Sequence, residues 1–167
     1  MKKIGLLFTC MFLMWGITGC SGKSDSTDPV IETSDRVIDE VRNSTSVTEV
    51  GVELEAELPQ TTDKVTIINY KAIKSGSELQ LSIKEDGSLT GVQVTGDMTD
   101  DSDEFVALVS GVTNISEFNI DSELYSKIGD VLKSQKESED IGDLTVGITT
   151  SGNTAKFFIL LNKYIEE

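Results

Sequence analysis

The sequence predicts an α+β fold in two layers: a mainly antiparallel sheet of about six strands, with helices packed on one of its faces. Three observations predict it. Several segments alternate apolar and polar residues, which is the period of a half-buried strand. Two later segments carry apolar residues at helical spacing, and the chain closes on a second pair of alternating segments. The expected order is therefore a β-meander, two helices and a closing β-hairpin, preceded by one short helix.

The short first helix is predicted from residues that can cap it and from apolar residues on one side. Thr33 or Ser34 can serve as the N-cap, and the helical pattern ends near Asn43. The buried side of this helix would consist of Val37, Ile38 and Val41.

Residues 50–58 predict the first strand, which Pro59 ends. Its apolar side would consist of Val50, Val52, Leu54, Ala56 and Leu58. Its other side carries Glu53, Glu55 and Glu57. Neighbouring carboxylates can divide acid and base roles only where burial pushes their pKa values apart. We expect this row to face water instead, with its repulsion offset by lysines on adjacent strands, namely Lys64, Lys71, Lys74 and Lys84.

The meander continues through three further strands. Residues 64–73 are rich in β-branched side chains and are apolar on both faces. Residues 79–84 alternate strictly, Asp86 and Gly87 provide a tight turn, and the next strand contains Val92 and Val94.

Two helices and a hairpin complete the domain. The earlier of these two helices carries Phe105, Leu108, Val109 and Val112 on one side. The later one carries Leu124, Ile128, Val131 and Leu132 after a cap at Asp121. Residues 144–148 and 157–161 form the hairpin across Ser151-Gly152-Asn153. The last strand is apolar on both faces, with Phe158 and Leu160 opposite Phe157 and Ile159, so we place it centrally in the sheet.

An acidic loop before the first of these two helices is a weak candidate for calcium binding. It contains Asp97, Asp100, Asp101 and Asp103, and calcium prefers oxygen ligands. An EF-hand register that begins at Asp97 places Ser102 at the glycine position and Leu108 at the bidentate glutamate position. The spacing therefore favours the alternative, in which residues 100–102 cap the helix and acidic side chains occupy its first turn.

Composition excludes several classes of chemistry. The chain has no histidine, which removes Ser-His-Asp catalysis, imidazole bases and the usual zinc sites. It has 14 basic and 29 acidic residues, a net charge of −15. Nucleic acid needs a basic footprint and is not an expected partner. We expect no cofactor and no enzymatic activity.

The first twenty residues have the pattern of an export signal. Lys2 and Lys3 precede an uncharged run over residues 4–17. That run is shorter than the roughly 20 apolar residues that a transmembrane helix needs. It ends in Ile17-Thr18-Gly19-Cys20, which resembles the lipobox of bacterial lipoprotein precursors.

The resemblance implies a specific processing pathway. In lipoprotein precursors a diacylglyceryl group, built on fatty acids such as palmitate, is attached to the cysteine thiol. Signal peptidase II then cuts before that cysteine. Cys20 would thus become the lipid anchor, in place of an ordinary secretory signal with an incidental cysteine. Cleavage would leave 12 basic and 29 acidic residues, a net charge of −17, and no other cysteine.

The predicted organisation has three parts. Residues 1–19 form a cleaved signal peptide, residues 20–28 a lipidated cysteine with a flexible linker, and residues 29–167 one extracytoplasmic domain. The protein would be held on the extracytoplasmic face of the cell membrane through the lipid on Cys20.

A looser resemblance covers the C-terminal third of the chain. Residues 105–121, the following helix and the closing hairpin resemble the corresponding half of small Gram-positive lipoproteins, and this likeness implies no catalytic residue. Two functions are therefore expected. The first is a non-catalytic binding or interaction role, with an envelope protein as partner. The alternative is a histidine-free hydrolase, or a ligand-binding lipoprotein, that uses carboxylates.

Overall fold

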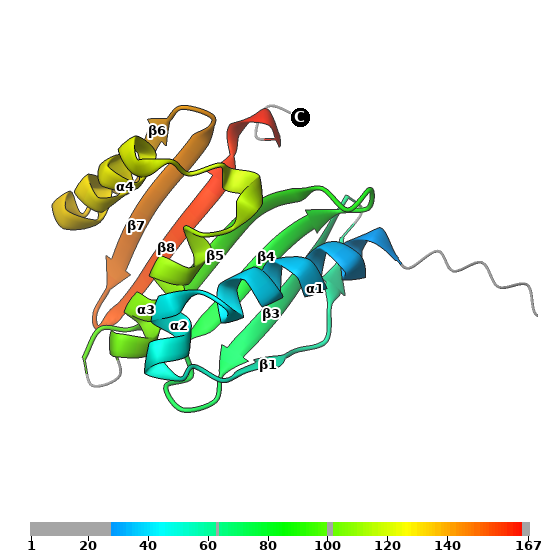
Figure 1. Ribbon diagram of the computed structural model, residues 1–167, viewed down its shortest axis with the longest axis horizontal. Coiled ribbons are helices and arrows are strands. Elements are labelled where there is room, and N and C mark those ends of the chain that lie inside the picture. The colour runs from blue at the N-terminus through cyan, green and yellow to red at the C-terminus, as the bar shows by residue number, and fades with distance from the viewer. Residues whose placement is uncertain (1–27, 63, 100–101, 165–167) are drawn as a thin grey trace, which may run out of the picture.

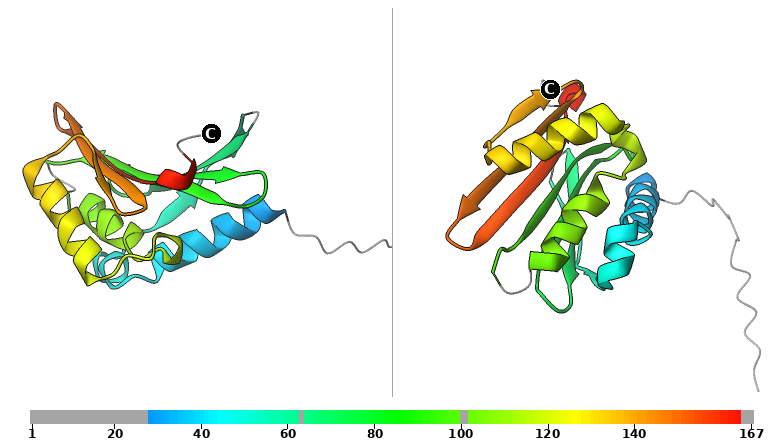
Figure 2. Two further views of the ribbon diagram at one scale, coloured as in Figure 1. Left: turned by 90° about the horizontal axis from the view of Figure 1, so that it is seen from above. Right: turned by 60° about the vertical axis from the view of Figure 1, so that its left-hand side comes forward.

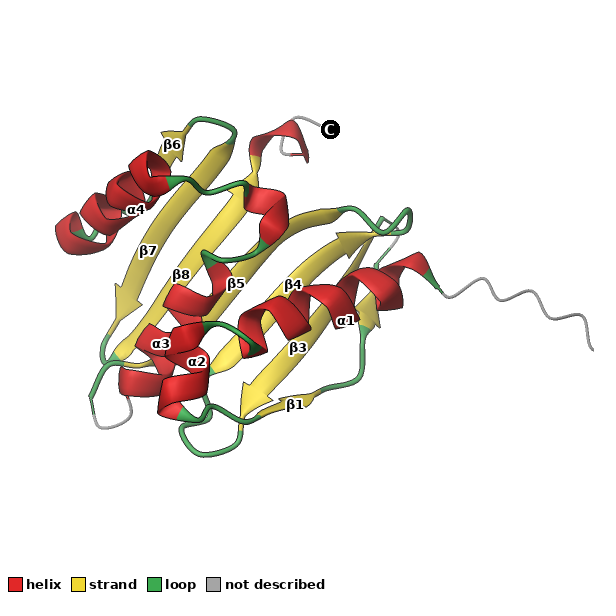
Figure 3. Cartoon of the chain, viewed as in Figure 1, coloured by secondary structure: helices red, strands yellow, loops and turns green. Residues whose placement is uncertain are grey.

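The predicted α+β class is confirmed. The computed structural model describes residues 28–62, 64–99 and 102–164, and in them all four α-helices lie on one side of an antiparallel sheet (Figure 1; Figure 3). The helices are α1 (Pro29–Arg42), α2 (Thr45–Val50), α3 (Ser102–Val112) and α4 (Ser122–Ser134), with short 3₁₀ turns η1 (Ser116–Phe118) and η2 (Asn162–Tyr164). Within the described residues, no helix has the length and apolar character needed to cross a bilayer.

The sheet contains more strands than the sequence predicts. Its strands are β1 (Leu54–Ala56), β2 (Gln60–Thr61), β3 (Val65–Ala72), β4 (Glu78–Lys84), β5 (Leu89–Asp97), β6 (Glu139–Ile141), β7 (Leu144–Ser151) and β8 (Thr154–Leu161). They form one eight-stranded sheet in the order β1-β3-β4-β5-β8-β7-β6, with β2 also paired to β3. Strands β2 and β6 have only two and three residues, so neither is long enough to show an alternating pattern.

The position of β8 agrees with the prediction from its apolar faces. Its neighbours are β5 and β7, both antiparallel to it. Phe157 and Ile159 are fully buried, whereas Phe158 and Leu160, on the other face, are half-buried. The two apolar faces of β8 thus correspond to a strand inside the sheet, with one face under the helices and the other half-buried on the open face.

The core lies between the sheet and the helical layer, which Figure 2 shows from two further directions. The meander supplies Leu79, Leu81 and Ile83, each fully buried. The helices supply residues at the predicted spacings, namely Val37, Val41, Leu108, Val112, Ile128 and Val131. Each such side chain contributes roughly 1.5–3 kcal/mol through burial, so packing of these helices against the sheet is the main stabilising interaction.

The predicted start of the first helix is wrong. Helix α1 begins at Pro29, and Asp28 is its N-cap, with the Val30 N–H donating to Asp28 Oδ1 at 2.9 Å. Proline is favoured in the first turn because its missing N–H would have no partner there. Thr33 and Ser34 instead lie inside the helix and are buried. The Thr33 hydroxyl donates to the Gly87 carbonyl at 2.7 Å, and the Ser34 hydroxyl pairs with the Tyr70 hydroxyl at 2.6 Å.

The predicted strand over residues 50–58 is largely wrong. Residues 45–50 form α2, which ends where Gly51 adopts a left-handed conformation with φ 73°. Only Leu54–Ala56 remain as β1. Val52 and Leu54 are buried as expected, but Val50 is 40% and Leu58 89% exposed. The alternating pattern therefore covers a helix end, a bend and a strand of three residues.

Candidate functional site

The lipobox and half of the acidic loop lie outside the described residues, since these exclude residues 1–27, Asp100 and Asp101. Asp97 ends β5, and its carboxylate accepts hydrogen bonds from the Thr99 hydroxyl at 2.6 Å and the Thr99 N–H at 2.8 Å. These bonds hold the pKa of Asp97 below its usual value, the side-chain bond having the larger effect. Asp103 is exposed in the first turn of α3.

No metal centre emerges from the described part of the chain. There, no group of three or more Asp, Glu, Cys or His side chains is placed to hold a metal ion. Asp97 forms a local turn with Thr99, and the described members of the acidic loop do not converge on one point.

The row of glutamates in and beside β1 faces water, as predicted. Glu53, Glu55 and Glu57 are all exposed. Glu55 lies directly opposite Lys71 in the β1–β3 register, so Lys71 is one of the predicted compensating lysines. Carboxylates divide acid and base roles where burial sets their environments apart, and this row is exposed to solvent, so it lacks the property that acid-base catalysis requires.

Among the described residues, one acidic side chain is buried. Glu104 in α3 is 6% exposed, and its carboxylate accepts a hydrogen bond from the Ser75 N–H at 3.1 Å. This bond ties the β3–β4 turn to the start of α3. A carboxylate with no second buried carboxylate beside it does not form the pair that a glycoside hydrolase uses.

A hollow of about 470 Å³ lies among η1, the start of α4 and the β6–β7 turn, and two of its acidic side chains have structural roles. Asp121 is the N-cap of α4 and accepts from the backbone N–H groups of Glu123 at 3.0 Å and Leu124 at 2.8 Å. Glu117 pairs with Arg36. Both of these carboxylates are therefore committed to contacts within the fold.

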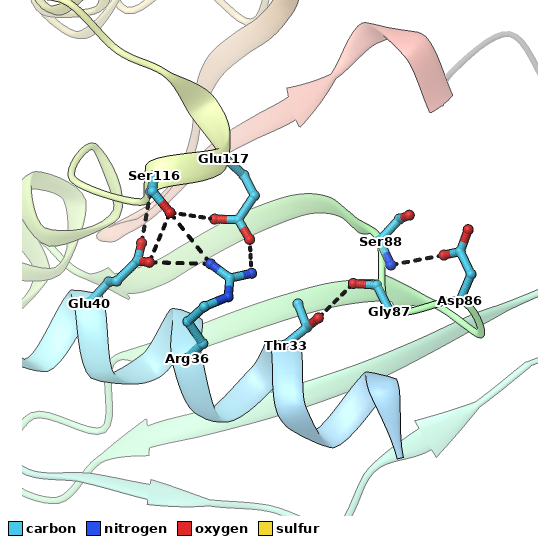
Figure 4. A network of polar contacts seen from close by, with 8 residues as sticks. All are labelled: Thr33, Arg36, Glu40, Asp86, Gly87, Ser88, Ser116 and Glu117. Atoms are coloured by element: carbon cyan, nitrogen blue, oxygen red, sulfur yellow. Dashed lines mark hydrogen bonds and ion pairs between the residues drawn. The ribbon is translucent and has the colours of Figure 1, made fainter. Parts of the chain in front are cut away.

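Arg36, the partner of Glu117, belongs to a polar network that links α1 to η1 (Figure 4). Arg36 also contacts Glu40 at 3.2 Å. Glu40 accepts from the Ser116 N–H at 2.7 Å and from the Ser116 hydroxyl at 2.9 Å. The contacts between α1 and η1 join residues 76 to 81 positions apart in sequence. The network is therefore a structural link between α1 and η1.

A neighbouring contact fixes the N-terminal part of α1 to the β4–β5 turn (Figure 4). Thr33 donates to the Gly87 carbonyl at 2.7 Å, and the turn itself is closed by the Ser88 N–H, which donates to Asp86 at 2.9 Å. That backbone hydrogen bond, with a further one from the Ser88 side chain, lowers the pKa of Asp86. The start of α1 is thus held firmly against the sheet.

An apolar groove crosses the outer surface of the helical layer. Its deeper part lies between α3 and α4, has a volume of about 160 Å³, and is lined by Val106, Val109, Tyr125, Ile128, Gly129 and Leu132, with Ser110 and Thr113. Its wider part, of about 360 Å³, continues between α2 and α3 past Ser46, Glu49, Val50, Asp103 and Ala107. The two parts share Val106, Ser110 and Tyr125, so we treat them as one helical groove.

The helical groove is lined by apolar side chains that remain exposed to solvent in the folded domain. Val106 is 56%, Tyr125 54% and Val50 40% exposed. Its only charged lining residues among those described are Glu49 and Asp103, both exposed acids. Exposed apolar surface with a polar rim is typical of a protein-interaction site.

The open face of the sheet is a weaker candidate. A hollow of about 250 Å³ there is lined by Gln80, Ser82, Gln93, Phe158 and Leu160. Gln80 donates to Asn69 at 2.9 Å, and the Phe158 ring lies against Gly147, where a Cβ would meet it. Gln80 and Phe158 thus already have contacts within the sheet, which makes this face the weaker candidate.

Sequence reasoning missed the helical groove. Val106 and Tyr125 lie beside the predicted buried stripes of α3 and α4, and two apolar side chains out of register with such a stripe are a weak signal by themselves. Neither the spacing of α3 from α4 nor the approach of α2 can be read from periodicity. No protein-family model, curated protein or solved structure matches the chain.

Proposed function

We propose that the protein is a lipid-anchored binding protein, tethered to the outer face of the cell membrane through Cys20, whose domain binds a protein partner without catalysing a reaction. The observation that carries the binding role is the helical groove, where Val50, Val106 and Tyr125 leave apolar surface in water between α2, α3 and α4. The anchor is supported by the resemblance of Ile17-Thr18-Gly19-Cys20 to a lipobox.

The two parts of the proposal fit each other physically. Two acyl chains hold a protein stably at a bilayer, whereas one gives only marginal binding. A tethered domain meets partners at the membrane surface at high effective concentration, so a modest groove suffices for specific binding. The carboxylate-dependent hydrolase has no comparable support, since Glu104 is the one buried acid among the described residues.

The anchor is tested by replacing the two cysteines one at a time. Cys20→Ser should move the protein from the membrane fraction to the soluble fraction. Cys10→Ser is the matched control, because it removes a thiol from the predicted signal peptide and should leave the protein membrane-bound. Mass spectrometry of the mature N-terminus should find a diacylglyceryl group on Cys20. A Cys20→Ser protein that stays in the membrane would contradict the anchor.

A further inference from the structure

We infer that the helical groove binds a basic, amphipathic helical segment of another extracytoplasmic protein. This inference rests on the proposed function, since it names the partner class of the binding site proposed there. Four features of the described residues support it: the charge of the groove, its size, the glycine that lines it and its position relative to the predicted tether.

The charge of the groove selects a basic partner. Glu49 and Asp103 stand at its rim, and none of its described lining residues is Lys or Arg. The nearby Lys127 on α4 already donates to Glu123 at 2.8 Å, a bond that raises its pKa. A segment with Lys or Arg beside its apolar face would pair with the rim. A second copy of this chain, with its net charge of −15, would be repelled.

The size and shape of the groove suit the side chains of a bound segment. The part between α3 and α4 has a volume of about 160 Å³, below the roughly 300–1,000 Å³ of typical small-molecule sites, and the part toward α2, of about 360 Å³, lies at the low end of that range. The continuation toward α2 makes the groove elongated. Apolar side chains at i, i+3 and i+4 of a docked helix would enter it in sequence, which is a common mode of peptide recognition.

Gly129 lines the groove, and packing inside the domain does not explain why this residue is glycine. It lies in the middle of α4, where glycine costs about 1 kcal/mol relative to alanine. A Cβ at this position would meet nothing within 4 Å. Gly111 in α3 is different, because a Cβ there would lie 2.9 Å from Val47 and 3.1 Å from Ser44. A bound segment approaching α4 closely would account for Gly129.

The groove lies at the end of the helical layer that is farther from the predicted tether. The predicted tether joins the domain at Asp28, the N-cap of α1. Helix α1 has 14 residues, which corresponds to about 21 Å, and α2 and the groove follow its far end (Figure 1). Anionic lipid headgroups would also be repelled by the acidic rim. The apolar surface is therefore placed to meet a protein partner and not the membrane.

The experiment places a photo-crosslinking residue, p-benzoylphenylalanine, in the full-length protein in its own cells. Tyr125 is the groove position, since one aromatic side chain replaces another, and Gln93 reports on the open face of the sheet. We expect crosslinks from position 125 to a segment of another protein. By mass spectrometry, that segment should carry net positive charge and apolar residues at helical spacing.

Groove variants in the position-125 background then test the site itself. Gly129→Leu fills the groove with a good helix former, and Val106→Lys adds a positive charge, so each should lower the crosslinking yield at least tenfold. Ile73→Lys is the matched control, because Ile73 is 60% exposed, close to the 56% of Val106, and lies outside the groove. Thermal unfolding followed by circular dichroism should show that all three variants remain folded.

The possible outcomes separate this inference from the proposed function. Crosslinks to a protein from position 93 alone would leave a tethered binding protein and overturn the groove as its site. Crosslinks from position 125 to lipid, to another copy of this chain or to an acidic segment would overturn the partner class. An absence of crosslinks from both positions would overturn both proposals.

Discussion

At the scale of single residues, Gly129 and Gly147 have opposite surroundings. A Cβ at Gly129 would project into the open helical groove, whereas one at Gly147 in β7 would collide with the Glu137 carbonyl oxygen and the Phe158 ring, well inside 3.0 Å. The Phe158 ring thus covers a strand glycine on the open face of the sheet. Gly147 is explained by packing within the domain, and Gly129 is not.

We predict that alanine has opposite effects at these two positions. Gly129→Ala should raise the free energy of unfolding by about 0.5–1 kcal/mol, because alanine is the better helix former. Gly147→Ala should lower it by about 1–3 kcal/mol, because the added methyl group overpacks a filled site. Urea unfolding followed by circular dichroism measures both. A Gly129→Ala protein less stable than the wild type would show that packing inside the domain requires this glycine.

At the scale of helices and strands, the sequence predicts most accurately where one local signal dominates. Asp121 is the cap of α4, as expected from its place before the periodic stripe. The two apolar faces of β8 correctly place it inside the sheet. The strand predicted over residues 50–58 is largely wrong because Gly51 ends α2 in a left-handed conformation. The alternation of apolar residues does not reveal this helix end.

The start of α1 illustrates a second limit. Thr33 and Ser34 are good capping residues, but their hydroxyls bond to Gly87 and Tyr70, which are distant in sequence. A tertiary partner of this kind lets a capping residue lie inside a helix. The cap is instead Asp28, the last residue of the predicted linker.

The link between α1 and η1 yields a prediction about these two elements. Arg36 pairs with Glu117, and both side chains are partly exposed, at 44% and 24%. Exposed ion pairs typically contribute 0.2–1 kcal/mol. In a double-mutant cycle with Arg36→Met and Glu117→Gln, we expect a coupling energy of about 0.5 kcal/mol that decreases as salt is added.

The cycle needs a control pair that also joins a basic and an acidic side chain but lies within one helix. Lys127 and Glu123, at i,i+4 within α4, provide it. That pair should show only a weak, salt-sensitive coupling, without affecting how α1 is held. A coupling near zero between Arg36 and Glu117 would mean that Glu40 and Ser116 alone fasten α1 to η1.

At the scale of the whole molecule, the helical layer has a firmly held end and an end with exposed apolar surface. The start of α1 is fixed to the β4–β5 turn, while the far end of α1 leads into α2 and the helical groove. The groove depends on how α2, α3 and α4 are spaced in three dimensions. The sequence alone therefore predicts the two apolar stripes of α3 and α4 but not the surface left between them.

This arrangement predicts how the domain would sit at a bilayer if Cys20 carries the proposed anchor. A flexible chain of eight residues spans roughly 16 Å, so a tether that joins the domain at Asp28 would place the turn beside Asp28 nearest the lipid and the groove farther out. In the lipidated protein on nanodiscs with spin-labelled headgroups, the amide signal of Gly87 should broaden more than those of Val106 and Gly129. Reducing the nitroxide with ascorbate should restore all three signals. Equal or greater broadening at Val106 would place the groove against the membrane and make lipid, rather than a protein segment, the ligand it contacts.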